Sequence, residues 1–227
     1  TAATSIPAKY ESKIFSFLDM KMGQKPWPLG QSLADDIFSR NSIDPVYKPE
    51  VFLSCDPSVN AIALPGKKII VFKGLLKDDM KLNSLYFILG HEIGHVLNRD
   101  HLKSMGRAIA ISLGLFFVNV GADSNSFFSI NQAIVDRRFS QGQESASDDR
   151  AITYTIKRFK GLYTSNDFFD TIQKISPDSS KLASFLNTHP MTQDRIDKIK
   201  NNPEYNPTTT SVEKIDPATI DCPDSGT

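Results

Sequence analysis

The chain has 227 residues, of which 40% are hydrophobic and 23% are charged, as expected of a globular protein with one substantial core. Its 26 basic and 26 acidic side chains cancel, and no cluster of Lys and Arg is present of the kind that neutralises a run of phosphates. The composition therefore argues against nucleic acid as a partner.

The first fifty residues predict two short helices, at about 10–21 and 29–39. Between them lies Lys25-Pro26-Trp27-Pro28, where two prolines forbid a continuous helix. We interpret residues 1–50 as a helical cap on the main body. The start of the chain lacks the charged and apolar stretches of a secretory signal and has no initiator Met, as expected of a trimmed or mature form.

Residues 51–74 change to short β-rich runs, VFLSC, VNAIAL and KIIVFKG, separated by turn residues. We expect a small antiparallel sheet, which needs a helix against one face. That helix is predicted at 81–98, because apolar residues recur there every three or four positions and form a stripe over about five turns. The stripe consists of Leu82, Leu85, Tyr86, Leu89, Ile93, Val96 and Leu97.

The rest of the chain predicts more helices. The apolar segment AIAISLGLFFV at 108–118 is shorter than the roughly 20 residues needed to cross a bilayer, so it is either a buried helix or one that dips into a membrane. From residue 203 the tail shows no periodicity, and we expect it to be extended or poorly ordered unless Cys222 holds it. The main domain is thus 51–202 and the tail 203–227, with a Ser/Asn-rich loop at 123–131 and helices at 143–160, 167–174, 179–186 and 191–201.

The two cysteines, Cys55 and Cys222, lack the close spacing of structural zinc sites. They either form one disulfide that closes a long loop, which suits an oxidising compartment, or remain unpaired thiols. Sequence separation does not decide between these, because it says nothing about distance in space.

The most informative segment lies within the helix predicted at 81–98, where Gly90-His91-Glu92-Ile93-Gly94-His95 contains the pattern His-Glu-x-x-His. Residues four apart share a helix face, so His91 and His95 can converge on one metal ion. Glu92 can reach a water activated by that ion and act as general base. Zinc matches these ligands and supports peptide hydrolysis. The alternative is an ordinary solvated helix face.

A catalytic zinc needs three protein ligands and one open position, so a third ligand is expected downstream. The best candidate is Glu144, on the helix predicted at 143–160. Asp148 lies four residues later on the same face and can accept the outer N–H of a zinc-bound imidazole, which fixes the tautomer of that ring. A solvated acidic helix face is the alternative, which the pairing with His91 and His95 disfavours.

Four stretches of the chain resemble the HtpX and CAAX prenyl endopeptidase family of gluzincin zinc metallopeptidases, which includes mitochondrial and periplasmic quality-control proteases. The resemblance implies an α+β, zincin-like fold, mainly helical, with a small antiparallel sheet whose edge strand lines the active-site cleft. It also implies one zinc per chain. The stretches run over about 59–195 and are NAIALPG leading into IIVFKGLL, LGHEIGHVLNRDH, ESASDDRA, and THP followed by Arg195.

The resemblance also assigns an edge strand that binds the substrate peptide as an added strand, so that main-chain hydrogen bonds supply affinity with little sequence demand. An interior strand is the alternative reading. The residues concerned are Asn60, Ala61, Ile62 and Ala63, followed by Leu64.

Two further residues gain roles from the resemblance. Arg195 matches the family's cation that stabilises the tetrahedral oxyanion, whereas the alternative is an ion pair with Asp194 or Asp197 on a surface helix. His189 matches the histidine that occupies the open position of the zinc in some periplasmic members, whereas the alternative is a loop residue before Pro190. Family members often carry His directly after the Arg in the position of Arg99. Here Asp100 intervenes, so we expect His101 to lie at the surface.

The metal-binding motif and the resemblance together predict a zinc-dependent endopeptidase. The resemblance implies that it cleaves extended or misfolded protein segments and, with the two cysteines, that it is located in the bacterial periplasm or associated with the envelope membrane. One alternative is a zinc-stabilised, chaperone-like binding module with an occluded, inactive site, although such a module has no need of Glu92. A prenyl-protein endopeptidase is a second alternative, but it requires a membrane-enclosed chamber that no stretch of this sequence can build.

Overall fold

The computed structural model describes residues 5–16, 24–76, 80–103, 138–162, 187–190, 192–206 and 213–222. The apolar segment 108–118, the loop 123–131 and the helices predicted at 167–174 and 179–186 lie outside these residues. The described part combines helices with one small sheet, which confirms the predicted α+β class.

The sheet has four strands in the order β1-β2-β4-β3: β1 (Gln24–Pro26), β2 (Glu50–Ser54), β4 (Lys68–Phe72) and β3 (Ala61–Leu64). The β1–β2 and β3–β4 pairs are antiparallel, but β2 and β4 are parallel. The expected all-antiparallel sheet is wrong in this respect, because β4 folds back from β3 into the position between β3 and β2. The sequence also gave no sign of β1, whose Pro26 is tolerated because it lies in an edge strand.

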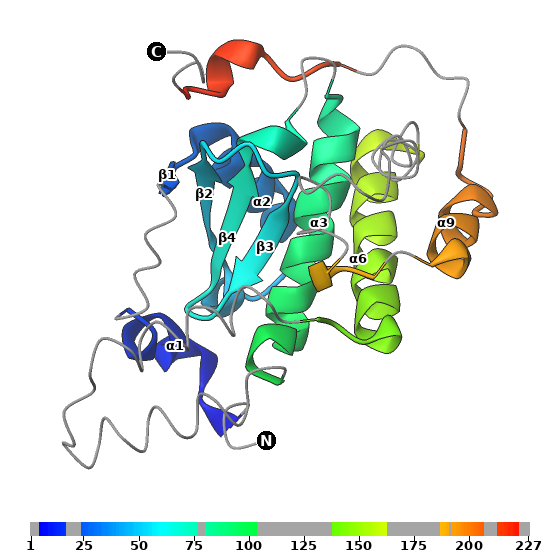
Figure 1. Cartoon of the computed structure of the whole chain (residues 1–227). Coiled ribbons are helices and arrows are strands. Elements are labelled where there is room, and N and C mark those ends of the chain that lie inside the picture. The colour runs from blue at the N-terminus through cyan, green and yellow to red at the C-terminus, as the bar shows by residue number, and fades with distance from the viewer. Residues whose placement is uncertain are drawn as a thin grey trace, which may run out of the picture.

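The helices pack around the sheet in the arrangement shown in Figure 1. Helices α2 (Pro28–Arg40) and α3 (Leu82–Asn98) contact the sheet and each other, and α6 (Gln141–Phe159) packs along α3 on the side away from the sheet. Helix α9 (Gln193–Lys200) lies against α6 in turn. The structure also contains α1 (Ala8–Ile14) and the short helices η2 (Pro45–Tyr47), η3 (Lys73–Leu75) and η4 (Pro217–Thr219).

Helix α3 is the centre of the molecule. Its sequence predicts one apolar stripe, but because the sheet, α2 and α6 surround it, every residue from Asn83 to Val96 is buried. The apolar side chains of α2, the strands and α3 join in one core. Its largest fully buried members include Trp27, Tyr86, Phe87, Ile37, Leu53, Leu85, Leu89 and Ile93.

The C-terminal segment 213–222 is held against the body of the protein. Its backbone hydrogen-bonds to that of Met80 and Leu82, at the start of α3, and the indole N–H of Trp27 donates to the carbonyl of Thr219 at 2.9 Å. A disulfide joins Cys222 to Cys55, which decides between the two readings left open by the sequence. The described segment 213–222 is therefore tied to the body of the protein by Cys222, as the sequence left open.

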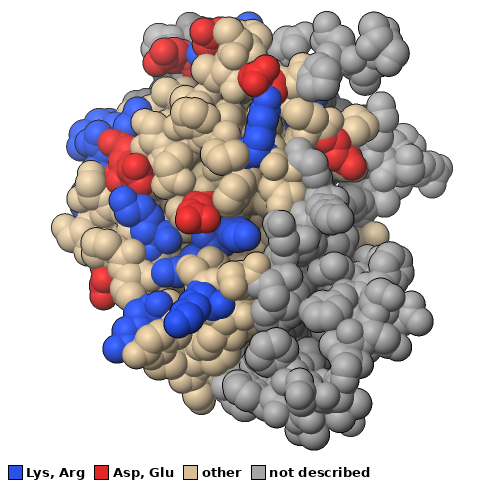
Figure 2. Space-filling view, turned by 90° about the vertical axis from the view of Figure 1, so that its left-hand side faces the viewer, with Lys and Arg blue, Asp and Glu red and all other residues tan. Residues whose placement is uncertain are grey.

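The surface carries charge of both signs. On the face turned toward the viewer in Figure 2, Lys and Arg side chains lie among Asp and Glu side chains rather than apart from them. Ion pairs between solvent-accessible side chains include Lys48 with Asp35 and Lys198 with Asp149. Among the described residues, no helix is both long enough and apolar enough to span a membrane.

Candidate metal centre

The first part of the candidate site lies in the middle of α3. His91, Glu92 and His95 are 5%, 1% and 0% exposed, so this stretch is buried and not the solvated helix face of the alternative reading. Their four-residue spacing places the two imidazoles on one side of the helix, with Nε2 of His91 and Nε2 of His95 3.1 Å apart.

The second part lies in the first turn of α6. Ser140 caps this helix in a capping box with Gln143, and Glu144 follows directly. Two glycines of α3 allow α6 to approach closely. A Cβ on Gly94 would lie 2.9 Å from Cα of Ser147, and one on Gly90 would lie 3.2 Å from Cα of Ala151. Glycine at these positions therefore lets the carboxylate of Glu144 reach the two histidines.

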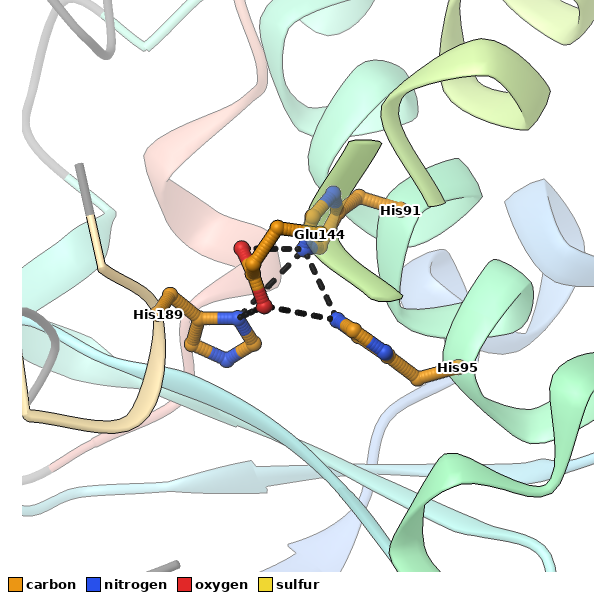
Figure 3. A group of neighbouring side chains, drawn as sticks. All are labelled: His91, His95, Glu144 and His189. Carbon is orange, nitrogen blue, oxygen red and sulfur yellow. Dashed lines mark hydrogen bonds and ion pairs between the residues drawn. The ribbon is translucent and has the colours of Figure 1, made fainter. Parts of the chain in front are cut away.

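His189 joins the same group from the segment 187–190, and Figure 3 shows the three imidazoles and the carboxylate turned toward one another. One ligand atom from each of His91, His95, Glu144 and His189 lies within 4.8 Å of the others, and all four residues are buried. Oε1 of Glu144 is 3.2 Å from Nε2 of His95 and 3.1 Å from Nδ1 of His189, and that Nδ1 is 3.4 Å from Nε2 of His91. We refer to these four residues as the metal centre.

Carboxylates on the far side of two rings decide how those rings can bind a metal. Nδ1 of His91 is 2.9 Å from Asp148, as predicted, and Nδ1 of His95 is 3.0 Å from Asp100, which the sequence did not suggest. Because an ionised carboxylate only accepts hydrogen bonds, each Nδ1 donates and each neutral ring carries its lone pair on Nε2. Two lone pairs and the carboxylate of Glu144 therefore face one another across about one hydrogen-bond length.

Three acceptors at this distance need a positive charge between them. Burial lowers the pKa of His95, but hydrogen bonds to Asp100 and Glu144 and the charges of Glu144 and Glu92 outweigh it and raise that pKa to about 9. The surroundings thus favour a cation at Nε2 of His95. Zinc–ligand bonds of 2.0–2.2 Å place tetrahedral ligands about 3.3–3.6 Å apart, close to the separations in the metal centre. The residues present fit a zinc ion.

Arg195 lies beside this group and is 4% exposed. Its guanidinium donates to both oxygens of Asp148, at 2.7 and 2.9 Å, and lies 2.6 Å from Oε2 of Glu144. Burial alone would raise the pKa of Asp148, but Arg195 and His91 hold it below its usual value. The alternative of a surface ion pair with Asp194 or Asp197 is wrong, because α9 turns Arg195 toward α6.

The remaining predicted residues lie as follows. Oε1 of Glu92 is 3.5 Å from Nε2 of His189, so that ring lies between Glu92 and Glu144. Strand β3 is an edge of the sheet among the described residues, packs against α3, and is buried, as is Asn60 before it. No described strand lies beyond β3, and the assignment of 60–64 as the substrate strand stays a prediction.

The expectation for His101 is also wrong. It is fully buried, and its Nε2 lies 2.7 Å from Oε1 of Glu11. The sequence likewise missed Phe139, whose ring stacks on His95 at 3.9 Å between centroids. No periodicity or motif could reveal either contact, because each joins segments that are far apart in the sequence or separated by a turn.

Comparison with known proteins agrees with a metal site at these residues. The model of the family described as "Peptidase family M48" matches residues 31–202. Metalloprotease LoiP of Escherichia coli is 28% identical over 163 residues, covering 66% of this chain and 60% of LoiP. Metalloprotease YcaL, also of E. coli, is 26% identical over 188 residues, covering 79% of this chain and 69% of YcaL.

A third relative is mitochondrial. The metalloendopeptidase OMA1 of Schizosaccharomyces pombe is 26% identical over 156 residues, covering 67% of this chain. The chain spans only 46% of the length of that protein, and likewise less than two thirds of LoiP. Because the family model matches well over half of the chain, and matches the part that carries the metal centre, the chain belongs to peptidase family M48, as the resemblance of its motifs predicted.

Proposed function

We propose that this chain is a zinc-dependent endopeptidase that hydrolyses peptide bonds in extended or misfolded proteins. The observation that carries the proposal is the meeting of three metal-binding acceptors, on His91, His95 and Glu144, directly beside the carboxylate of Glu92. The family to which the chain belongs supports the same reaction.

When bound, zinc supplies a Lewis acid that polarises a carbonyl and lowers the pKa of a water. The protein's own residues supply the remaining steps. Glu92 takes the proton from the attacking water and returns it to the leaving amine, since it is the carboxylate of the site that is not needed as a ligand. The guanidinium of Arg195 places a positive charge at the edge of the metal centre, where it stabilises negative charge that develops on the substrate oxygen.

The substrate peptide adds to the sheet along β3, at Asn60 to Leu64. The position of β3 at the edge of the sheet, next to the helix that carries His91 and His95, supports this assignment. Backbone hydrogen bonds would then provide most of the affinity, so a wide range of unfolded segments could be cleaved.

His189 acts as a fourth ligand in a closed state of the enzyme. Its Nδ1 lies within 3.1–3.4 Å of Glu144 and His91, so it would also reach a zinc held by these residues and would compete there with a water or a substrate carbonyl. The segment 187–190 must therefore move before a peptide can be cleaved. This closed arrangement also favours a second candidate function, a zinc-stabilised module that binds unfolded proteins without cleaving them.

The enzyme works in the bacterial periplasm or at the envelope membrane, in protein quality control. The disulfide between Cys55 and Cys222 supports an oxidising compartment. A further relative, 24% identical over 157 residues, is named a putative beta-barrel assembly-enhancing protease of Vibrio cholerae. A peripheral contact with the membrane is part of this proposal.

The first test combines the zinc content of the purified chain with cleavage of unfolded casein by the same samples. We expect about one zinc per chain, and cleavage that falls about 10²–10⁴-fold in Glu92→Gln while the zinc remains. Glu144→Ala should lose both zinc and cleavage. Casein bound but not cleaved by the wild-type chain would favour the binding module. Zinc retained in Glu144→Ala would place the third ligand elsewhere, with His189 as the next candidate.

A further inference from the structure

Asp100 occupies a position that the family motif does not explain. Helix α3 ends at Asn98, and Arg99 adopts a left-handed conformation with φ of 56°, which turns the chain sharply. This turn brings Asp100 back toward the helix, where it is 1% exposed and its Oδ2 lies 3.0 Å from Nδ1 of His95. Burying a carboxylate costs free energy unless hydrogen-bond donors pair with it, so Asp100 needs the N–H of His95 as much as His95 needs an acceptor.

We propose that Asp100 is a positioning residue that fixes the imidazole of His95 for metal binding and, through Gln143, joins it to the helix that carries Glu144. The inference rests on the proposed zinc site. It adds a second carboxylate–histidine pair to that of Asp148 and His91, so that each histidine of the motif has its own acceptor.

Gln143 provides the link between the two helices. Its Nε2 donates to Oδ1 of Asp100 at 3.0 Å, while its Oε1 accepts from the backbone N–H of Ser140 at 2.9 Å. One amide therefore both closes the capping box of α6 and holds Asp100. Because Glu144 is the next residue, a shift of Gln143 would also move the third metal ligand.

The contacts of Asp100 differ in burial, and therefore in how much each can stabilise the position of its carboxylate. The contact with His95 is fully buried, whereas the third partner, Lys103, has a side chain that is 49% exposed. An exposed pair of this kind contributes little. Lys103→Ala is therefore a matched control that alters the charge near Asp100 without touching the metal centre.

The experiment measures zinc affinity by competition with a chromophoric chelator, the rate of zinc release, and the thermal stability of the metal-free chain. Asp100→Ala should weaken zinc binding about 10- to 100-fold, because His95 loses the acceptor that sets its tautomer. Asp100→Asn should lie between Asp100→Ala and wild type. Its amide oxygen can still accept from His95, but its NH₂ group then faces the donor of Gln143.

A second pair of variants separates the link from simple helix capping. Gln143→Ala and Ser140→Ala both break the capping box, but only Gln143→Ala removes the contact with Asp100. We expect Gln143→Ala to weaken zinc binding several-fold more than Ser140→Ala, and Lys103→Ala to leave it unchanged.

Wild-type zinc affinity and release rate in folded Asp100→Ala would overturn the inference, provided that the wild-type chain binds one zinc. Equal zinc affinity in Gln143→Ala and Ser140→Ala would overturn the link to α6 and leave the pair with His95. An absence of zinc from the wild-type chain would instead count against the proposed function, so the two failures are distinguishable.

Discussion

Two buried clusters of histidine and carboxylate lie near the C-terminal half of α3. They differ in how the negative charge of the buried carboxylate is balanced. One is the metal centre. The other, the Glu11 cluster, consists of Glu11, Arg99 and His101, with Glu11 and His101 2% and 0% exposed. Both clusters pair histidine with a buried glutamate, so burial alone does not identify a metal site.

The difference lies in which atoms face one another. In the Glu11 cluster, Arg99 and His101 face the carboxylate of Glu11 at 3.1 and 2.7 Å, and the backbone N–H of Gly66 donates to it at 3.3 Å. Donors therefore meet both carboxylate oxygens of Glu11, which needs no ion. In the metal centre, Nε2 atoms that carry lone pairs meet each other and the carboxylate of Glu144. Arg195 meets one oxygen of Glu144, and the remaining acceptors need either a proton on His95 or a metal ion between them.

The Glu11 cluster also has a structural position that matters for β3. Glu11 and Ser12 of α1 bind the backbone N–H and carbonyl of Gly66, in the turn between β3 and β4. Arg99 and His101 join this group to the end of α3. The cluster thus holds the turn after the proposed substrate strand against the helix that carries the metal ligands.

The largest effect is expected when the self-balanced cluster is broken. Glu11→Ala leaves Arg99 and His101 without their buried partner and should lower the free energy of unfolding by about 3–5 kcal/mol. Urea unfolding of the metal-free chain would measure this loss, with Glu204→Ala, at an exposed position, as the control. Zinc content of the folded variant should stay at the wild-type value. A loss of zinc without a loss of stability would mean that Glu11 acts on the metal centre and not on the stability of the fold.

The next largest effect concerns the metal centre itself. Asp148→Ala removes the acceptor of His91 and should weaken zinc binding about 10- to 100-fold, equivalent to about 1.4–2.7 kcal/mol. Asp149→Ala is the matched control, because Asp149 is the next residue but lies on the surface with a side chain that is 62% exposed. Chelator competition on both variants gives the comparison. Equal affinities would remove Asp148 from any role at the metal.

The sequence predicted much of this site because its information is local. His91, Glu92 and His95 share one helix, and Glu144 and Asp148 share another, so four-residue spacing was enough to group them. The bounds of α3 and α6 also agree with the predicted helices to within two residues. The need of a catalytic zinc for a third protein ligand then joined the two helices into one site.

What the sequence did not reveal depends on turns and on distant contacts. Asp100 and His101 follow a left-handed residue, so the direction of their side chains cannot be extrapolated from the helix before them. The partner of His101 lies 90 residues away in α1. The parallel pairing of β2 with β4 was missed for a similar reason, since alternation of apolar residues does not encode the order of strands.

The smallest expected effect is a change in acid sensitivity of the metal-free chain, studied with excess chelator so that zinc loss does not contribute. Burial would raise the pKa of Glu11, but the hydrogen bond from His101 and the charges of His101 and Arg99 lower it below 4.5. Asp36 is a second such group, where burial is outweighed by hydrogen bonds from Arg40, Tyr86 and Arg158, and its pKa is lowered to about 2.

A carboxyl group with a lowered pKa stabilises the folded state above its unfolded pKa, and this contribution disappears as the pH falls through the folded value. Unfolding free energy should therefore decline below about pH 4.5, with a slope of at most about 1.4 kcal/mol per pH unit from each group. Glu11→Gln should flatten the decline just below pH 4.5, and Asp36→Asn should flatten it between about pH 4 and 2. A Glu11→Gln chain with the wild-type slope would show that the carboxylate of Glu11 is not held by His101 and Arg99. The Glu11 cluster would then lose the charge balance that sets it apart from the metal centre.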